Sequence, residues 1–309
     1  FLCADLAISN APRADHAQYL ACWLAVLKQD KRALFLNLER NGNSLGFSSN
    51  ERDKFIQKNA LPVYDGTQDY LLWLGCMGSY DAQGREVVLS LVRILKHLGI
   101  TYGVLKKERC TGDSARRLGN DLAFQTLAEW NLEQIKAAKP KKMLSICPHC
   151  VRTMNTDWKE FGAELDVEHH SVFLARLKDK LPKAQGLDGQ VVFHDPCYLG
   201  RYQDVYDEPR AVIAHSLPVI DPPKARERSF CCGAGGGLAF LGEETGTRVN
   251  ETRAKELVAT GASTVGVACP FCSTMFKDAI KTVAPGKEPR LLDIAQIAAA
   301  GLPPESPQG

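Results

Sequence analysis

Short apolar runs and amphipathic stretches alternate along most of the chain. Four apolar runs end in cysteine: YLLWLGC (70–76), MLSICPHC (143–150), VVFHDPC (191–197) and STVGVACPFC (263–272). Runs of this length, bounded by Gly and Pro, are typical of buried strands. Between them lie segments with helical spacing of their apolar residues: REVVLSLVRILKHLG (85–99), AFQTLAEWNLEQIKAA (123–138) and TRVNETRAKELVATG (247–261). Strands that alternate with helices predict parallel sheets covered by helices.

This order of elements occurs twice. Each half closes with one more apolar run and an amphipathic one, LDVEHHSVFLARL (165–177) and PRLLDIAQIAAAG (289–301). We therefore predict an α/β protein of two tandem, pseudo-symmetric domains, at 65–182 and 188–304. Each domain is expected to be a small parallel sheet flanked by helices.

Residues 1–64 are predicted to form an N-terminal extension, helical at first and loop-like through RNGNSLGFSSNER (40–52). The extension carries no motif, so we expect it to pack on the domains or to face a partner. Its two cysteines, Cys3 and Cys22, are expected to be buried or partner-facing thiols. The chain begins with Phe rather than Met, which we interpret as a processed product or the ordered part of a longer polypeptide.

Composition narrows the function classes. The net charge of +2 gives no basic surface of the kind that nucleic-acid-binding domains carry. Apolar runs such as YLACWLAVL (19–27) are far shorter than the roughly 20 residues that span a bilayer. The chain has 11 cysteines and no visible secretory signal, which favours metal binding or redox chemistry over a disulfide scaffold.

Eight cysteines repeat in register. Cys76, Cys110, Cys147 and Cys150 recur 121 or 122 residues later as Cys197, Cys231, Cys269 and Cys272. The second copy adds Cys232, where the first copy has Thr111. We treat this duplication as real.

The predicted strands bring these cysteines together. One cysteine follows each of the four apolar runs, at the carboxyl end of a predicted strand, where open α/β sheets bind ligands. Thiolates in fours are ligands for zinc or for iron–sulfur clusters. One C-x2-C with two single cysteines fits a zinc ribbon poorly and suits a cluster cradled by several loops. Four thiolates suffice for a cubane [4Fe–4S] cluster, and five exceed its need.

Glycines follow the vicinal cysteines in RSFCCGAGGG (228–237). Glycine permits close approach and positive φ, so backbone N–H groups could point at cluster sulfurs. The predicted cofactor-binding glycines are Gly233, Gly235, Gly236 and, in the first copy, Gly112 alone.

The motifs then resemble a known family. HDPCYLGRY (194–202), FCCGAGGG (230–237) and ACPFC (268–272) resemble the CCG domain, the cysteine-rich domain found in heterodisulfide reductases. GCMGSYD (75–81), ERCTGDSARRLGN (108–120) and CPHC (147–150) are similar to one branch, the long iron–sulfur oxidoreductases linked to electron-transferring flavoprotein. The resemblance runs from about residue 35 to 300.

This resemblance implies specific cofactors. Five cysteines would hold a non-cubane [4Fe–4S] cluster in the second domain: Cys197, Cys231, Cys232, Cys269 and Cys272. The first domain departs from the pattern at Thr111, so a cubane [4Fe–4S] cluster or zinc is expected on Cys76, Cys110, Cys147 and Cys150.

The resemblance also implies a function. We expect an iron–sulfur subunit or domain of an oxidoreductase complex, passing electrons between a flavoprotein or ferredoxin and an acceptor such as menaquinone. Its partners would be other redox subunits, including a membrane quinone-reactive one, which implies a cytoplasmic chain held at the inner face of the membrane. One alternative is a heterodisulfide reductase-like subunit that cleaves a disulfide at the non-cubane cluster. A third is a zinc-stabilised scaffold.

Other residues near the motifs carry weaker predictions. His194 and Asp195 are expected to shape the turn before Cys197 or to hydrogen-bond the cluster surroundings. Candidate proton donors are His194, His169 and His170, each with a structural role as the alternative. His149 is expected beside the cluster ligands or exposed. Four arginines could neutralise anionic clusters, bind an acidic partner or end solvated helices: Arg116, Arg117, Arg201 and Arg210. Tyr198 and Tyr202 are expected to pack.

Overall fold

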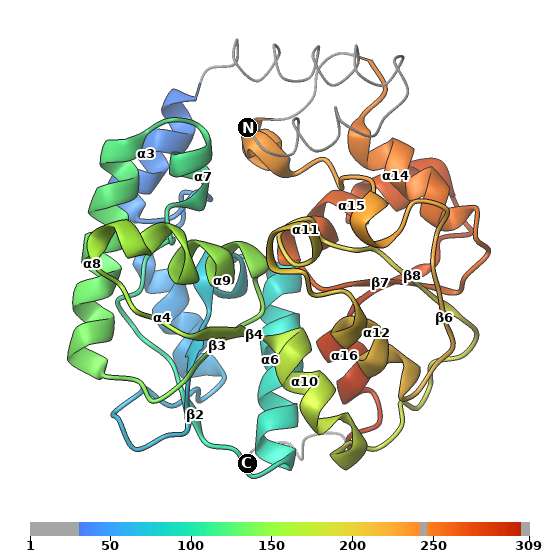
Figure 1. Ribbon diagram of the computed structural model, residues 1–309, viewed down its shortest axis with the longest axis horizontal. Helices are drawn as coiled ribbons and strands as arrows, with labels where there is room; N and C mark the ends of the chain where they lie inside the picture. Colours follow the sequence, from blue (N-terminus) through green and yellow to red (C-terminus); the bar gives the residue numbers. More distant parts are fainter. Residues whose placement is uncertain (1–30, 242–245, 304–309) are drawn as a thin grey trace.

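Two parallel sheets, each of four strands, lie side by side in the computed structural model, which describes residues 31–241 and 246–303 (Figure 1). The strand orders are β2-β1-β3-β4 and β6-β5-β7-β8. The first sheet contains β1 (Tyr70–Trp73), β2 (Tyr102–Gly103), β3 (Met143–Ser145) and β4 (Val167–His169). The second contains β5 (Val191–Phe193), β6 (Val219–Ile220), β7 (Thr264–Val267) and β8 (Arg290–Asp293). The predicted α/β class and the two tandem, helix-flanked parallel sheets are confirmed.

Helices connect the parallel strands, which cannot be joined by tight turns. The N-terminal part and first domain contain α3 (Arg32–Asn41), α4 (Ser49–Lys58), α5 (Gly75–Tyr80), α6 (Ala82–His97), α7 (Asp113–Arg117), α8 (Asp121–Ala138), α9 (Pro148–Asn155) and α10 (His170–Leu177). The second domain contains α11 (Gly200–Gln203), α12 (Asp207–Ala214), α13 (Leu238–Leu241), α14 (Val249–Val258), α15 (Pro270–Val283) and α16 (Ile294–Ala299). Each sheet lies inside one of the predicted intervals, and the exact domain boundaries remain predictions.

The extension differs from its prediction. The loop expected over 40–52 is shorter, because α4 begins at Ser49 after an N-cap in which Ser48 Oγ accepts a hydrogen bond from the Asn50 N–H at 3.3 Å. Residues 1–30, with Cys3 and Cys22, lie outside the described residues. No helix among the residues described is both long and apolar enough to cross a membrane.

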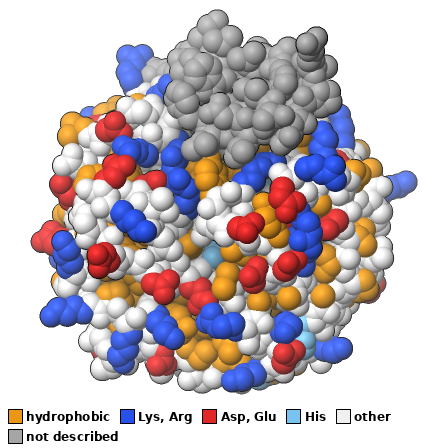
Figure 2. Space-filling model, in the orientation of Figure 1, with side chains coloured by type: hydrophobic (Ala, Val, Ile, Leu, Met, Phe, Trp, Pro, Cys, Tyr) orange, Lys and Arg blue, Asp and Glu red, His pale blue; other side chains and the backbone are white. Residues whose placement is uncertain are grey.

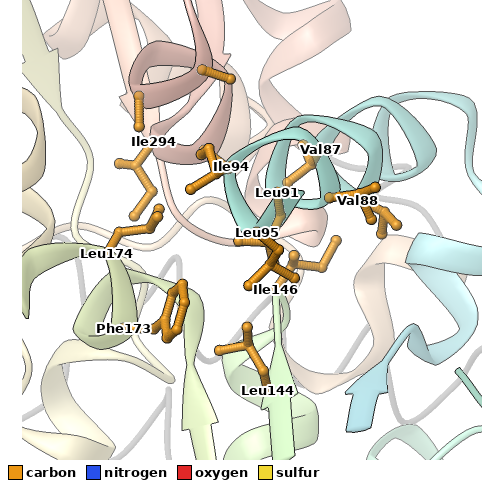
Figure 3. Close-up of a cluster of buried hydrophobic side chains, with 14 of the residues drawn as sticks. Val87, Val88, Leu91, Ile94, Leu95, Leu144, Ile146, Phe173, Leu174 and Ile294 are labelled. Carbon is orange, nitrogen blue, oxygen red and sulfur yellow. The ribbon is translucent and has the colours of Figure 1, made fainter. Parts of the chain in front are cut away.

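One apolar core is shared by both domains. Helix α6 packs on α16, and α10 packs on α12, so four helices lie between the sheets (Figures 1 and 3). The fully buried Leu91 and Leu95 of α6 belong to the same cluster as Phe193 of β5 and Ile294 of α16. The domains are therefore joined through a continuous apolar layer, which fixes their cysteine-bearing edges relative to one another.

Candidate metal centre

Two sets of cysteines lie at the carboxyl edges of the sheets. The first cysteine set is Cys76, Cys110, Cys147 and Cys150. The second cysteine set is Cys197, Cys231, Cys232, Cys269 and Cys272. None of these nine forms a disulfide. Seven are buried, whereas Cys197 and Cys231 are partly exposed.

The C-P-x-C sequence explains how two cysteines of each set converge. Cys147 and Cys269 are the N-caps of α9 and α15, with extended backbones. A proline stands at the first helical position after each, where its fixed φ favours the helix start and no N–H is lost. Cys150 and Cys272 then fall within the first helical turn, close to the N-cap cysteine.

Within the first set the thiols interact with one another. A hydrogen bond between Cys76 and Cys110 lowers the pKa of Cys76 and, together with burial, raises the pKa of Cys110 well above its ordinary value. A hydrogen bond from Cys147, with burial, raises the pKa of Cys150 in the same way. Four mutually interacting buried thiols form a donor set suited to a metal or cluster that takes thiolates.

Glycines bring the backbone against the sulfurs. Gly75 has φ +66°, and a Cβ there would lie 3.2 Å from Cys150 Sγ. Gly112 N–H points at Cys110 Sγ at 3.5 Å, and Gly233 N–H points at Cys231 Sγ at 3.3 Å. Gly112 and Gly233 hold matching positions of the repeat with φ of +88° and +89°. Both copies therefore direct a backbone N–H at sulfur, as expected around an anionic cluster.

The other predicted glycines lie in the 3-10 turn η4 (Gly235–Gly237). Gly237 allows close packing between the domains, because a Cβ there would lie 2.7 Å from a methyl carbon of Leu118. The role assigned to Gly235 and Gly236 in making room for a cluster remains a prediction.

The fifth cysteine has a counterpart in the first domain. Cys232 Sγ lies 3.3 Å from Cys272 Sγ. At the matching place, Thr111 Oγ1 lies 4.0 Å from Cys150 Sγ. The first domain thus keeps the position and offers a hydroxyl there instead of a thiol.

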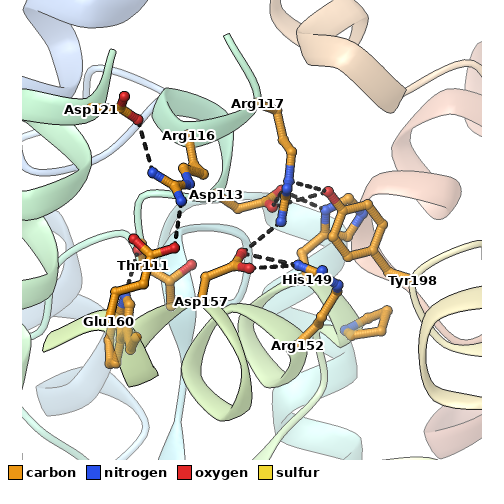
Figure 4. Close-up of polar contacts among 12 residues, drawn as sticks. Thr111, Asp113, Arg116, Arg117, Asp121, His149, Arg152, Asp157, Glu160 and Tyr198 are labelled. Carbon is orange, nitrogen blue, oxygen red and sulfur yellow. Dashed lines mark hydrogen bonds and ion pairs between the residues drawn. The ribbon is translucent and has the colours of Figure 1, made fainter. Parts of the chain in front are cut away.

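A polar network lies where the domains meet (Figure 4). His149 Nδ1 is 2.8 Å from Asp113 Oδ2, and the Tyr198 ring stacks on His149 with centroids 3.6 Å apart. Tyr198 also donates to Asp113, at 3.0 Å. His149, which comes from the first domain, hydrogen-bonds Cys269 of the second set. Burial lowers the pKa of His149, but the bonds to Asp113 and Cys269 outweigh it and raise this pKa well above its usual range.

The four arginines named from the sequence have protein partners. Arg116 pairs with Asp121 and Glu160; Arg117 with Asp113 and Asp157; Arg210 with Asp195 and Asp221; and Arg201 donates to the carbonyls of Glu227 and Ser229. Asp195 also accepts a hydrogen bond from the Arg226 N–H at 2.7 Å, which anchors the turn before Cys197. Neutralisation of a cluster by these arginines remains a prediction.

His169 and His170 belong to a buried chain of hydrogen bonds between the domains. His170 Nε2 is 2.8 Å from Asp293 Oδ1, and its Nδ1 is 3.2 Å from His169 Nε2. His169 also hydrogen-bonds the backbones of Ile146 and Ala268, each of which directly precedes a cysteine. Burial lowers the pKa of His169 well below its usual value. These contacts give both histidines a structural role, and proton donation by them remains a prediction.

A loop of the N-terminal extension contacts the first cysteine set, and no pattern in the sequence predicts this contact. Gly42 carbonyl accepts a hydrogen bond from Cys110 N–H at 2.7 Å, and Ser44 Oγ lies 3.8 Å from Cys76 Sγ. Both residues belong to a loop without periodicity or motif, so only the fold shows that it covers the first set.

A cavity lies between the domains beside the first set. Its walls include Cys76, Cys110, Cys150 and Thr111 from one domain and Gly235, Gly237, Phe240 and Phe271 from the other. Cys197 and Cys231 do not line it. The face shown in Figure 2 carries basic and acidic side chains interspersed, in keeping with the small net charge.

Comparisons with known proteins agree with this geometry. The family described as "Cysteine-rich domain" (CCG) matches residues 70–155 and 191–277. A second profile, "Zincin-like metallopeptidase", matches only residues 1–38 and shows no family membership.

Three curated relatives illustrate the similarity. The probable iron-sulfur-binding oxidoreductase FadF of Bacillus subtilis is 34% identical over 93% of this chain and 43% of its own length. The EtfAB:quinone oxidoreductase of Syntrophomonas wolfei is 35% identical over 90% of this chain and 42% of its own length. One subunit of the dihydromethanophenazine:CoB--CoM heterodisulfide reductase of Methanosarcina mazei is 34% identical over 68% of this chain and 54% of its own length. The chain thus spans only part of each relative.

Among solved structures, a hypothetical protein from Helicobacter pylori matches 83% of this chain and 55% of its own, with a TM-score of 0.52 and 11% identity. This likeness concerns the fold alone. Since the CCG profile matches more than half of the residues, in two copies that each contain one cysteine set, the chain belongs to the CCG family of cysteine-rich domain proteins.

Proposed function

We propose that this chain is the iron–sulfur electron-transfer part of an oxidoreductase. The observation that carries the proposal is the contact between the two cysteine sets through one side chain. His149 lies between Cys147 and Cys150 in sequence and hydrogen-bonds Cys269 of the other set. Clusters bound at both sets would be separated by about one side chain, an arrangement that suits direct electron exchange. The clusters would supply the redox chemistry, and the protein would position and tune them.

The two sets support different cofactors. We propose a non-cubane [4Fe–4S] cluster on the five cysteines of the second set. For the first set we propose a cubane [4Fe–4S] cluster, with zinc as the alternative. Support comes from Thr111, which stands at the fifth position and offers no thiolate.

Names of the relatives suggest the partners. One relative is an EtfAB:quinone oxidoreductase, and another, from Chromohalobacter salexigens, is a probable membrane-anchored ferredoxin. By extension, we propose a flavoprotein or ferredoxin on one side of the chain and a quinone such as menaquinone on the other. The chain would then work on the cytoplasmic side, held at the membrane through a partner.

A second candidate is reduction of a disulfide. The cavity between the domains, lined by Cys76, Cys110 and Cys150, adjoins the metal centre, and its volume of about 40 Å³ would have to widen before a small disulfide could enter. Two electrons and two protons would convert it to two thiols. The cavity adjoins the first set rather than the five-cysteine set, which makes this candidate weaker than electron relay.

The test is metal and sulfide analysis of the full chain purified without oxygen. About eight irons per chain, four for each [4Fe–4S] cluster, are expected, with two distinct Mössbauer and EPR signatures. Zinc at the first set with four irons at the second would retain electron transfer through one cluster. Zinc alone would overturn the proposal and favour the zinc-stabilised scaffold. Absence of any metal would overturn both. C76S and C197S should each lose one signature, while the control C22S, outside both sets, should lose none.

A further inference from the structure

A ring nitrogen occupies the same position in both repeats. Trp73 stands three residues before Cys76, and His194 stands three residues before Cys197. The two are 121 residues apart, the offset that also relates those cysteines. Trp73 ends strand β1, and His194 directly follows strand β5, so each ring lies at the carboxyl edge of its sheet.

The indole nitrogen of Trp73 is a buried donor without a partner among the described residues. The side chain is fully buried, and Nε1 has no hydrogen bond. A Cβ built on Gly75 would lie 3.8 Å from this Nε1 and 3.2 Å from Cys150 Sγ, so the donor adjoins the first set. Trp130 and Trp158, by contrast, donate to the carbonyls of Lys107 and Thr111 at 2.8 and 3.1 Å. Buried donors in native proteins almost always have a partner, so the exception at Trp73 points to one that the described residues do not supply.

His194 shows the same feature in the second domain. Its Nε2 is buried and has no hydrogen-bond partner in the part of the chain that is described. One of its ring nitrogens and the Sγ atoms of Cys232 and Cys272 all lie within 4.8 Å of one another. Phe276 packs edge-on against the ring, with centroids 4.8 Å apart, and holds its plane.

Arg253 determines which nitrogen carries the proton. Arg253 Nε donates to His194 Nδ1 at 3.2 Å. A guanidinium only donates, so Nδ1 must present its lone pair and the proton of the neutral ring stays on Nε2. Arg253 is itself fully buried and is held by the Lys224 carbonyl and by Glu256.

We propose that Trp73 Nε1–H and His194 Nε2–H are hydrogen-bond donors to the metal–sulfur group of their own domains, and that Arg253 is the positioning residue that makes His194 a donor rather than a metal ligand. This proposal rests on the proposed function, in which both sets hold such groups. A hydrogen bond to a cluster sulfur stabilises the more negative, reduced state, so each donor raises the midpoint potential of its cluster.

The experiment compares midpoint potentials in the full chain, prepared without oxygen, by EPR-monitored titration. W73F should shift only the first-domain cluster to a more negative potential, and H194F only the second-domain cluster. H194Q keeps an N–H donor, so its second-domain potential should lie closer to the wild-type value than that of H194F. W73H copies the donor of the other repeat, and its first-domain potential should likewise lie closer to the wild-type value than that of W73F.

W130F and H215F serve as controls and should leave both potentials unchanged, because these rings lie outside the cysteine sets. R253M should lower the second potential alone, since the His194 proton is then no longer fixed on Nε2.

Iron, sulfide and zinc analysis of each variant distinguishes a failure of the proposed function from a failure of this inference. Absence of clusters from the wild-type chain would overturn the proposed function. Clusters present, with potentials unchanged in W73F and H194F, would overturn this inference and leave the function standing. Loss of second-domain iron in H194F, together with strong nitrogen hyperfine coupling in the wild type, would show that His194 is a ligand and overturn the role of Arg253. If zinc occupies the first set, W73F should weaken zinc binding by about 10- to 100-fold, and unchanged zinc affinity would overturn the role of Trp73.

Discussion

His149 and Phe271 hold the same place in the two C-P-x-C segments, and their rings meet across the domain boundary with centroids 4.8 Å apart. The pseudo-symmetry of the repeat thus brings the two cysteine-bearing turns into direct contact. The contact is asymmetric in chemistry, because His149 reaches Cys269 whereas Phe271 offers no hydrogen bond in return. A first-domain side chain can therefore act on the second cysteine set.

Replacing His149 should consequently change the second centre. In H149F, Cys269 loses a donor that the high pKa of His149 keeps charged, and the second-domain cluster should shift to a more negative potential. Hydrogen bonds to charged groups contribute about 1.5–3 kcal/mol, enough for a measurable shift in an EPR-monitored titration. F271L is the matched control and should leave this potential nearly unchanged. A shift confined to the first-domain cluster in H149F would contradict the prediction.

Thr111 and Cys232 hold matching positions of the repeat, so substitution of either should change the type of cluster that its own domain binds. T111C supplies a thiol beside Cys150, at the place where the second domain has Cys232 beside Cys272. We expect T111C to give the first domain a second copy of the five-cysteine signature, and C232T to remove that signature from the second domain. Mössbauer and EPR spectra of the two variants, with iron content, measure the outcome.

Two controls accompany this exchange. T153C adds a thiol at another buried threonine of the first domain and should leave the spectra unchanged. C232S should behave as C232T does, since both replace the thiol with a hydroxyl. If C232T retained the wild-type spectrum, Cys232 would not be a ligand.

The parts of this structure that the sequence predicts are those encoded by local pattern. The strands before Cys76, Cys147, Cys197 and Cys269 are apolar runs with proline or glycine at their ends, and the cysteine offsets reveal the duplication directly. Two-residue strands such as β2 are too short to show a period. Ser44 lies near the first set only in the folded chain and stands in no motif, and the apolar run that contains Trp73 does not show that its ring nitrogen lacks a partner. The packing of α6 and α16 into one core likewise joins segments that are far apart in the sequence, so the pattern of neither helix predicts it.

Glu108 should make the stability of the metal-free chain depend on pH. Its carboxylate is buried; Leu74 N–H lies 3.3 Å from Oε2, and an Arg52 nitrogen lies 3.7 Å from Oε1. Burial raises the pKa of Glu108 to about 7, although Arg52 lowers it. The folded chain then holds a proton that the unfolded chain releases above its ordinary value of 4.5, so stability is fully present below pH 4.5 and falls as pH rises to about 7. At 1.36 kcal/mol per pKa unit, the loss is at most about 3.4 kcal/mol.

Denaturant unfolding of the metal-free chain between pH 4.5 and 8 measures this loss. E108Q cannot ionise, so its free energy of unfolding should gain on the wild type as pH rises to 7 and run parallel to it above. E133Q removes an exposed carboxylate of α8 and should follow the wild-type curve throughout. An E108Q curve parallel to the wild type over the whole range would show that Glu108 titrates normally.

The shared core predicts that the two domains unfold together. Three of the four tryptophans, Trp73, Trp130 and Trp158, lie in the first domain and none lies in the second, so in a W23F background tryptophan fluorescence reports the first domain alone. Leu257 belongs to a core cluster confined to the second domain, and its truncation in L257A should cost about 2–5 kcal/mol. If the domains are coupled through Leu91 and its neighbours, L257A should move the fluorescence transition of the first domain as far as the circular dichroism transition of the whole chain.

L91A should lower the free energy of unfolding reported by both signals by a similar amount. L122A, at a side chain that is 75% exposed, should change neither by more than about 0.5 kcal/mol. Separate transitions in L257A, with the fluorescence midpoint unmoved, would mean that the apolar layer between the sheets does not couple the domains, and the fixed spacing of the two cysteine sets would then need another cause.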